Sequence, residues 1–337
     1  MTTSEIAAAD RHTPLLSPVA PRAVYVQLPF IRERPEKVLF AATFGGLPAS
    51  AAPGLVHVPL EPLTGSGLAE LWYANGDVIT GSTGAIHYSA DDHFLAGVIE
   101  IDEPEHGGII AATAFAYRAI ANFQASSRFP HLLRMWNHLD AINLGDGDAE
   151  RYRGFCSGRV AGLEGFPLTQ FPAATVIGRR DGQRLLQVYW LAGRMPGIAL
   201  ENPRQLPAYR YPRHYGQTSP TFSRAMLVAP DLLLISGTAS IVGHASRHPG
   251  SVAGQVDEIF NNLDSLMSHA RARAPALPAG WGRSSLIKAY VRNRADLPEV
   301  EGRLRALVPA TVPFLVLLGD VCRADLLVEF DCLHAAG

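Results

Sequence analysis

Hydrophobic and polar positions change their spacing several times along the C-terminal part of the chain. Continuous apolar runs predict strands, and apolar residues at every third or fourth position predict helices. Val256, Ile259, Phe260, Leu263 and Met267, for example, would share one face of a helix. The predicted elements are, in chain order, strands at 224–230 and 231–237, a helix at 255–274, a strand at 286–291, a helix at 297–308, and strands at 313–318 and 326–333. This ββαβαββ order predicts an α+β unit, in which both helices pack on one face of a mixed sheet.

The first half of the chain repeats this order less clearly, with strand, helix, strand and helix patterns at 94–101, 108–125, 131–142 and 148–161. Two further apolar runs, 173–177 and 185–191, flank Asp181-Gly182, a dipeptide typical of tight turns, so we expect them to pair as a hairpin. The similar spacing indicates a tandem duplication of one unit. We therefore predict a flexible tail at 1–24, a degenerate N-terminal unit at 25–200 and a C-terminal unit at 201–337.

Composition and charge exclude several classes of function. The 337 residues are 47% hydrophobic, as expected of a globular chain, and the net charge of −2 offers no overall positive field to nucleic acid or an anionic membrane. The best apolar run, 312–318, is far shorter than the roughly 18 residues of a membrane span, and the first 22 residues lack the apolar core of a signal peptide. Three cysteines fit neither a disulfide framework nor zinc spacing. We expect a cytoplasmic protein without nucleic-acid or membrane partners.

Arginine supplies nearly all of the positive charge, since Lys37 and Lys288 are the only lysines among 29 basic residues. Guanidinium groups bind carboxylates and phosphates through two parallel hydrogen bonds, so the excess favours an acidic ligand. A coding bias toward GC-rich codons would produce the same excess. Because the chain has no phosphate-binding loop and its histidines are scattered, we expect neither a metal nor a nucleotide cofactor.

The apolar run 326–333 contains one candidate catalytic acid, Glu329. A carboxyl group buried in such a strand has a raised pKa and can act as a general acid near neutral pH, whereas on an edge strand it would simply face solvent. Cys322 lies seven residues earlier, and a hairpin between the last two strands would bring both side chains into one pocket. A lone cysteine is also a common small core residue.

Two segments carry candidate binding groups for an acid. Arg153 and Arg159 lie in the predicted helix at 148–161, where Arg159 shares an apolar face and would either reach into a cleft or cover the core with its stem. Segment 209–224 is dense in arginine and aromatic residues, including Tyr211, Tyr215 and Arg224. Such composition is typical of recognition surfaces, although the segment would also serve as a linker between the units.

A run of small residues follows the predicted strand at 231–237. Gly237, Thr238 and Ala239 would let a ligand approach the backbone closely and would offer it main-chain N–H groups. The predicted C-terminal unit therefore combines an acid, a permissive loop and neighbouring arginines, and we expect it to carry the active site.

Several segments resemble known families. The runs 233–237, 250–255, 259–263, 287–291 and 322–330 resemble successive signatures of YjgF/RidA-like proteins, in which Arg323 would fall near a carboxylate-binding arginine. Over roughly residues 30 to 335, the chain resembles the chorismatases. This second resemblance also rests on Arg151-Tyr-Arg-Gly-Phe-Cys-Ser-Gly-Arg and on Tyr215-Gly-Gln-Thr-Ser-Pro-Thr-Phe-Ser-Arg.

The resemblance implies cleavage of the enolpyruvyl ether of chorismate, with release of pyruvate and without a metal or organic cofactor. Glu329 would protonate the methylene carbon, and Cys322 matches the cysteine of members that form 3-hydroxybenzoate, alone or with 4-hydroxybenzoate. Chorismate carries two carboxylates, which suit arginine. The candidate substrate-binding residues are Arg153, Arg159, Tyr211, Tyr215, Arg224, Gly237, Thr238 and Ala239.

Alternatives remain at this point. The related hydrolytic activity would yield a trans-dihydroxycyclohexadiene carboxylate and pyruvate, and a chorismate mutase would yield prephenate. The same fold would also suit a non-catalytic binder of small acids or a RidA-like imine deaminase. RidA-like units trimerise, so a duplicated chain is consistent with either a monomer or a homotrimer.

Overall fold

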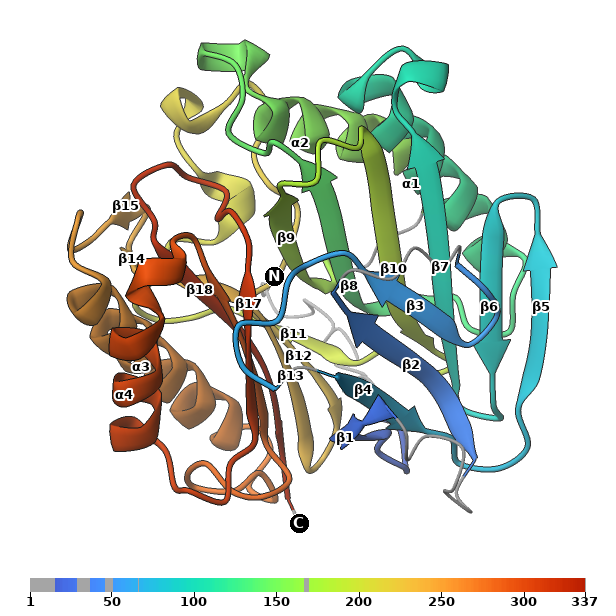
Figure 1. The fold of residues 1–337 in the computed structure, drawn as a ribbon. Coiled ribbons are helices and arrows are strands. Elements are labelled where there is room, and N and C mark those ends of the chain that lie inside the picture. Colours follow the sequence, from blue (N-terminus) through green and yellow to red (C-terminus); the bar gives the residue numbers. More distant parts are fainter. Residues whose placement is uncertain (1–15, 29–36, 46–50, 66, 167–169, 337) are drawn as a thin grey trace, which may run out of the picture.

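The computed structural model describes residues 16–28, 37–45, 51–65, 67–166 and 170–336. Residues 1–15 of the predicted tail lie outside the described residues, and Arg22 already begins a strand. In the described part of the chain, three large sheets surround one core, and pairs of helices cover the outer faces of two of them (Figure 1). No helix within these ranges is both long and apolar enough to cross a membrane.

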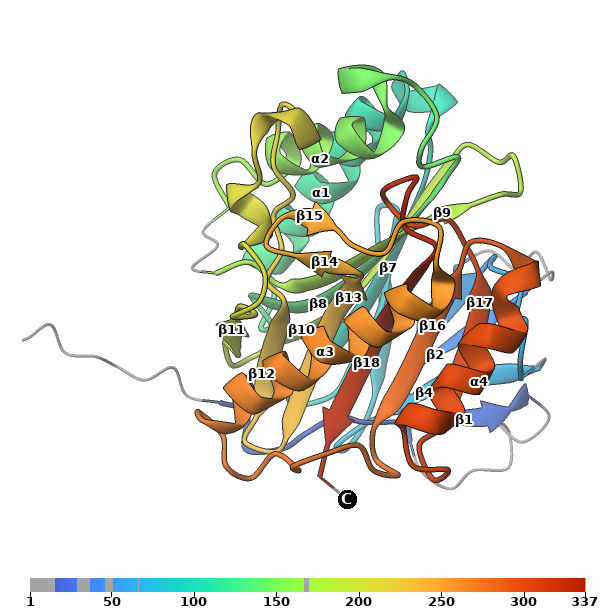
Figure 2. The same ribbon diagram turned by 90° about the vertical axis from the view of Figure 1, so that its left-hand side faces the viewer.

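The C-terminal unit follows the predicted ββαβαββ order. Its elements are β12 (Ala225–Ala229), β13 (Leu232–Ala239), α3 (Val252–Arg271), β16 (Leu286–Val291), α4 (Leu297–Leu307), β17 (Phe314–Leu318) and β18 (Val328–Ala335), with β11 (Ile198–Leu200) at the edge and the small pair β14 (Ile241–Val242) and β15 (Ala245–Ser246). These strands form a six-stranded sheet with the order β11-β12-β13-β18-β16-β17, which we call the second sheet. Figure 2 shows α3 and α4 lying across its outer face.

Local signals fix the ends of these two helices. Ser251 caps α3, because its hydroxyl accepts a hydrogen bond of 3.2 Å from the Gly254 N–H, which has no partner inside the helix. Pro298 occupies the first turn of α4, where its missing N–H costs no helical hydrogen bond. The apolar faces then pack on the sheet, with Ile259 and Leu263 fully buried.

The N-terminal unit has the same topology. It consists of β5 (Ile79–Thr83), β6 (Ile86–Ala90), β7 (Phe94–Asp102), α1 (Ile109–Ala125), β8 (His131–Asp140), α2 (Arg151–Gly162), β9 (Ala173–Arg179) and β10 (Leu185–Gly193). Its strands form a six-stranded sheet, which we call the first sheet. Its order, β5-β6-β7-β10-β8-β9, matches that of the second sheet strand for strand. In both sheets the last pair is parallel, β8 with β9 and β16 with β17. The predicted duplication is confirmed by this match.

Two predicted hairpins are wrong. Strands β9 and β10 do not pair across Asp181-Gly182, because β10 lies between β7 and β8. Likewise, β18 pairs with β13 and β16 rather than with β17. Both inserted strands are buried almost throughout, and a strand that is buried on both faces belongs in the middle of a covered sheet.

A third sheet lies within the range predicted as the N-terminal unit, and the sequence patterns did not reveal it. It is formed by β1 (Arg22–Gln27), β2 (Val38–Phe44), β3 (Leu55–Val58) and β4 (Leu68–Tyr73), in the order β1-β4-β2-β3. This order and its strand directions match β7-β10-β8-β9. In chain order its four strands correspond to β7, β8, β9 and β10 of the first sheet.

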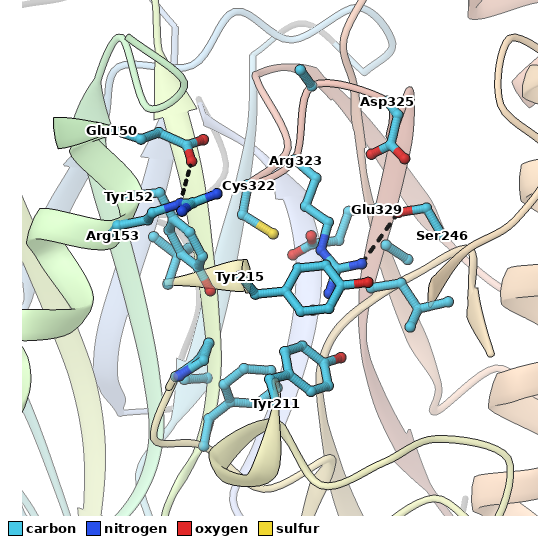
Figure 3. Close-up of a pocket in the computed structure, with 18 of the residues that line it drawn as sticks. Glu150, Tyr152, Arg153, Tyr211, Tyr215, Ser246, Cys322, Arg323, Asp325 and Glu329 are labelled. Carbon is cyan, nitrogen blue, oxygen red and sulfur yellow. Dashed lines mark hydrogen bonds and ion pairs between the residues drawn. The ribbon is translucent and has the colours of Figure 1, made fainter. Parts of the chain in front are cut away.

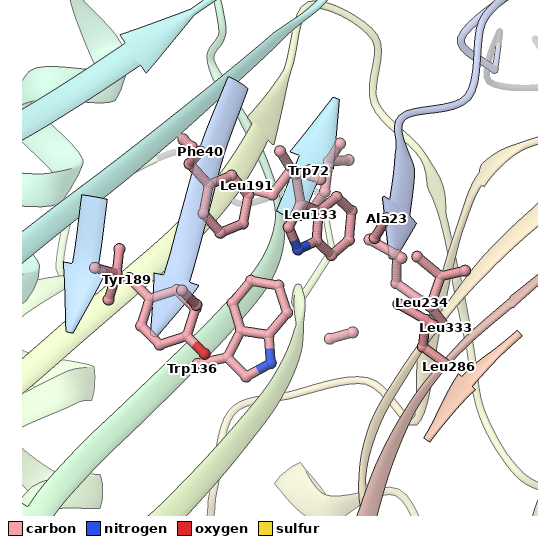
Figure 4. Packing of buried hydrophobic residues seen from close by; sticks show 14 of the residues in the cluster. Ala23, Phe40, Trp72, Leu133, Trp136, Tyr189, Leu191, Leu234, Leu286 and Leu333 are labelled. Carbon is pink, nitrogen blue, oxygen red and sulfur yellow. The ribbon is translucent and has the colours of Figure 1, made fainter. Parts of the chain in front are cut away.

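The inner faces of the three sheets enclose a common hydrophobic core (Figure 4). The N-terminal sheet contributes Phe40 and Trp72, whose rings stack at 5.4 Å, and the first sheet contributes Trp136 and Tyr189, whose rings stack at 4.8 Å. The second sheet contributes Leu234 to the same cluster. Burial of these large side chains joins the three sheets into one body.

Candidate active site

A cavity of about 430 Å³ lies between the two units (Figure 3). Its walls come from the first turn of α2, from β9, from segment 211–224, from strands β13–β15, and from the loop that precedes β18. Gly178 of β9 and Asp320 of that loop exchange two backbone hydrogen bonds of 2.8 and 2.9 Å, which hold the two units together beside the cavity. Both units therefore build the site.

Glu329 faces this cavity from the inner side of β18 and is 5% exposed. Val328 and Phe330 point to the opposite face, against α3, as strand alternation requires. Within the described residues, no hydrogen bond is made to the Glu329 carboxyl group. Burial, reinforced by the nearby Asp331 carboxylate, raises the pKa of Glu329 to about 8, although Arg134 and Arg224 oppose the shift. The group is therefore protonated at neutral pH, as a general acid requires.

Strand β13 pairs with β18 and forms the part of the wall beside Glu329. Gly237 and Ala239 face the cavity, whereas Thr238 points to the other side of the strand, where its hydroxyl donates to the Ser236 carbonyl at 2.9 Å. The prediction that Thr238 contacts the ligand is therefore not supported by its position. The alternation of side chains along a strand is the physical reason for the difference.

Cys322 lies in the loop before β18 and lines the cavity. Burial, together with the nearby Glu329, raises the pKa of its thiol to about 12. The thiol is thus neutral and forms a small, weakly polar part of the wall rather than a thiolate nucleophile. Asn143 of the N-terminal unit donates to the Cys322 carbonyl at 3.1 Å.

Arg292 at the end of β16 fixes the loop that carries Cys322. Its guanidinium group donates to the carbonyls of Val321, Arg323 and Leu326 at 2.8 to 2.9 Å, and to the Asp320 carboxylate at 2.7 Å. A planar group with five N–H donors suits this role, which a flexible ammonium group would not fill.

Arg224, which is 3% exposed, reaches the cavity from just before β12. One terminal nitrogen donates to the Tyr211 hydroxyl at 2.7 Å and to the Leu206 carbonyl at 2.9 Å. Its buried Nε has no hydrogen-bond partner among the described residues. An unpaired buried donor is costly, so a ligand carboxylate at this position would be favourable.

A second guanidinium group, that of Arg323, lies over the Tyr215 ring, 4.0 Å from its centroid. It donates to the His244 carbonyl at 2.9 Å and to the Ser246 hydroxyl at 3.2 Å (Figure 3). The Tyr215 hydroxyl is 3.1 Å from His244 Nδ1. This stack holds a cation at the cavity wall in a fixed orientation.

Arg153 lies on the opposite side, in the first turn of α2. Its Nε donates to the Glu150 carboxylate at 3.0 Å, and Asp148 lies 3.8 Å away. The neighbouring Tyr152 also lines the cavity, and burial raises the pKa of its hydroxyl, which lies near Cys322 and Glu329. Arg153 is thus a partly neutralised cation, and Tyr152 a protonated donor beside the acid.

Comparisons with known proteins place the chain in a family. A family model described as "Chorismatase FkbO/Hyg5-like, N-terminal" matches residues 70–192. A 3-hydroxybenzoate synthase from Streptomyces hygroscopicus is 36% identical over 283 residues, 80% of this chain and 82% of that protein. The chain belongs to the chorismatase family. A chorismatase from Streptomyces rapamycinicus is 34% identical over 78% of this chain and 81% of its own length. A crystal structure of a chorismatase covers 94% of this chain and 98% of its own, with 31% identity and a TM-score of 0.83.

Most of the residues singled out from the sequence meet in this chorismatase. The following line the cavity: Glu329, Cys322, Arg153, Tyr211, Tyr215, Arg224, Gly237 and Ala239. Their roles toward a substrate remain predictions. Within the described residues, no group of three or more His, Cys, Asp or Glu side chains is arranged to hold a metal ion.

Arg159 does not line the cavity, so its position does not support the predicted contact with a ligand. It is 2% exposed in the core under α1, with its guanidinium group 5.1 Å from the Tyr117 ring centroid and 3.8 Å from Met135 Sδ. It shares a helix face with Tyr152, but seven residues of α-helix carry it about 10 Å farther along the axis. This position favours the alternative interpretation, an arginine packed into the core.

Several cavity residues are not among the binding candidates predicted from the sequence, and Tyr152 and Ser246 are two of them. The sequence places Tyr152 only on an apolar helix face, although its neighbour Arg153 is a predicted binding residue, and both line the cavity. Ser246 lies on β15, whose two residues are too short for a periodic signal. Arg323 was noted only through the RidA resemblance, and the structure places it in the cavity wall.

Proposed function

We propose that this chorismatase cleaves chorismate to pyruvate and 3-hydroxybenzoate. The observation that carries the proposal is the buried Glu329 carboxyl group, which faces a cavity of suitable size and has a pKa of about 8. Cleavage of an enolpyruvyl ether begins when the methylene carbon accepts a proton, and a carboxylic acid that stays protonated at neutral pH can supply it. The named relatives support the same chemistry.

In this step, the electron pair of the enol double bond takes the proton from Glu329, and positive charge develops at the carbon attached to the ether oxygen. The Glu329 carboxylate left behind lies close to that charge and stabilises it. The bond between the ether oxygen and the ring carbon then breaks, and its electron pair makes that oxygen the keto oxygen of pyruvate. The ring takes over the positive charge, keeps its hydroxyl oxygen, and loses a proton as it becomes aromatic, which restores the Glu329 carboxyl group. Pyruvate and 3-hydroxybenzoate together contain the atoms of chorismate, so the overall reaction consumes no water, in contrast to the hydrolytic route.

The cations of the cavity suit the two carboxylates of chorismate. Arg224 and Arg323 lie at its wall with fixed orientations, and Arg224 retains an unpaired Nε. Arg153 lies at the other side and is partly neutralised by Glu150. Guanidinium groups bind carboxylates through charge-assisted hydrogen bonds, so we expect Arg224 and Arg323 to bind more strongly than Arg153.

The product type depends on the wall around the ring. A neutral thiol at Cys322 and the methyl group of Ala239 would leave few polar groups to position an attacking water. This supports 3-hydroxybenzoate, alone or with 4-hydroxybenzoate, over the trans-dihydroxycyclohexadiene carboxylate.

The test is incubation of the purified protein with chorismate, without added metal or cofactor. Pyruvate is measured with lactate dehydrogenase, and the aromatic product is identified by chromatography. We expect equal amounts of pyruvate and hydroxybenzoate, and loss of both in Glu329→Gln. Prephenate without pyruvate would indicate a mutase, and an unchanged substrate would favour the imine deaminase or acid-binding alternative.

We further infer a cytoplasmic monomer. The inner faces of the three large sheets are buried against one another within one chain, so they need no partner subunit. Size-exclusion chromatography with light scattering is expected to give the mass of one chain, 36.3 kDa, and three times that mass would show the homotrimer instead. Cell fractionation would test the location.

A further inference from the structure

A second carboxylate, Asp331, lies two residues from Glu329 on the same inner face of β18. We propose that Asp331 is a positioning residue that keeps Glu329 protonated for transfer of its proton to the substrate. The inference rests on the proposed role of Glu329 as the acid. Asp331 does not line the cavity, so it would act through Glu329 and not by contact with the substrate.

The surroundings of Asp331 are those of an ionised carboxylate. Its Oδ2 accepts hydrogen bonds from the Tyr290 hydroxyl at 2.7 Å and the Thr175 hydroxyl at 3.2 Å, and Arg134 lies 3.3 Å away. Lys288 Nζ is 3.9 Å from Oδ1. Because Asp331 is only 5% exposed, these groups rather than water stabilise its charge.

The cluster continues into the N-terminal sheet. Lys288 donates to Glu70 Oε2 at 2.6 Å, and Trp72 donates to Glu70 Oε1 at 2.7 Å. Glu70, Arg134 and Lys288 come from β4, β8 and β16, one from each large sheet. The acid of the cavity is therefore backed by a cluster that joins all three sheets.

The charges of this cluster already balance. Arg134 and Lys288 are two cations, and Glu70 and Asp331 are two anions, so their sum is zero. A deprotonated Glu329 would add a negative charge beside the Asp331 carboxylate, in a region with little water. Like charges at such a site disfavour ionisation of the second carboxyl group.

The other groups that face Glu329 come from several elements. Arg134 on β8 and Arg224 before β12 favour its ionised form, and Asp331 on β18 opposes it. Cys322 in the preceding loop and Tyr152 on α2 are neutral neighbours whose own pKa values are raised. A substrate carboxylate on Arg224 would remove one of the two opposing cations, and the proton would then be held more firmly.

The experiment measures kcat for pyruvate release as a function of pH. Activity should fall as rising pH deprotonates Glu329. In Asp331→Asn the midpoint of this fall should move to lower pH by about one unit, because the repelling charge is gone. In Arg134→Met it should move to higher pH, because an attracting charge is gone. Opposite shifts cannot arise from a general loss of packing.

Glu105→Gln is the control, since it changes a carboxylate to an amide at an exposed position outside the cluster. Its midpoint should stay within experimental error of the wild type. Unchanged midpoints in both Asp331→Asn and Arg134→Met would overturn the proposal, and if Asp331→Asn does not fold, an unchanged midpoint in Arg134→Met would suffice. Absence of pyruvate release by the wild type would instead refute the proposed function.

Discussion

Gly237 lies so close to Glu329 that a Cβ at position 237 would stand 2.9 Å from Glu329 Cδ, closer than real Cβ atoms approach. The two residues face each other on β13 and β18, which are paired through Ala239 and Glu329. The missing side chain leaves room for the acid to point into the cavity.

Gly237→Ala is therefore expected to displace the carboxyl group and to lower kcat for pyruvate release about 100-fold, the scale of loss caused by a misplacement of about 1 Å. Steady-state kinetics with chorismate would measure it. Gly302→Ala, on α4, is the control, because its Cβ would meet nothing within 4 Å. Wild-type kcat in Gly237→Ala would mean that Glu329 can act from another position.

Glu329→Gln should abolish pyruvate release and yet stabilise the fold at alkaline pH. Burial raises the pKa of Glu329 from 4.5 to about 8, so the folded chain binds a proton that the unfolded chain has lost. The free energy of unfolding of the wild type therefore decreases as pH rises from about 5 to 8. The variant lacks this decrease, and its Tm relative to wild type should be higher at pH 8.5 than at pH 5.

Glu105→Gln, which changes an exposed glutamate, is the control for this comparison. Thermal unfolding followed by circular dichroism at both pH values supplies the measurement. A Tm difference that does not depend on pH would show that Glu329 titrates alike in the folded and unfolded chains.

Arg224→Gln should weaken substrate binding, whereas Arg159→Gln should lower only the stability of the fold. Loss of the Arg224 guanidinium group removes a charged hydrogen-bond donor from the cavity and should raise KM for chorismate about 10- to 100-fold. Arg159→Gln should lower Tm, because Arg159 packs on Tyr117 in the core, and should leave KM unchanged. A large KM effect in Arg159→Gln would contradict the placement of this residue.

Cys322→Ala should change the ratio of aromatic products while pyruvate release continues. The thiol is a neutral part of the cavity wall, so its removal alters the space around the ring more than the acid step. Chromatography of the products would measure the ratio. Cys156→Ala removes a buried thiol from the core beneath α2 and should leave the ratio as it is.

Local signals in the sequence predicted much of the C-terminal unit. The apolar face of α3 and the proline in α4 follow from spacing alone. The burial of Glu329 is one of two positions that the apolar run allows, and the structure shows the buried one. The pairing of the central strands cannot be predicted in this way. The apolar pattern of β10 shows that the strand is buried, but it does not show which strands lie beside it. The same holds for Arg159, whose helix face was evident while the element opposite it was not.

The matching strand order of the three sheets has a consequence for how the site can change. In a ring of identical subunits, each substitution would appear at every junction between sheets. Here the three sheets are encoded separately, so residues at the junction that forms the cavity can vary while the aromatic core elsewhere stays packed. Specificity can thus be altered on one side of the molecule without loss of the contacts that hold the other sides together.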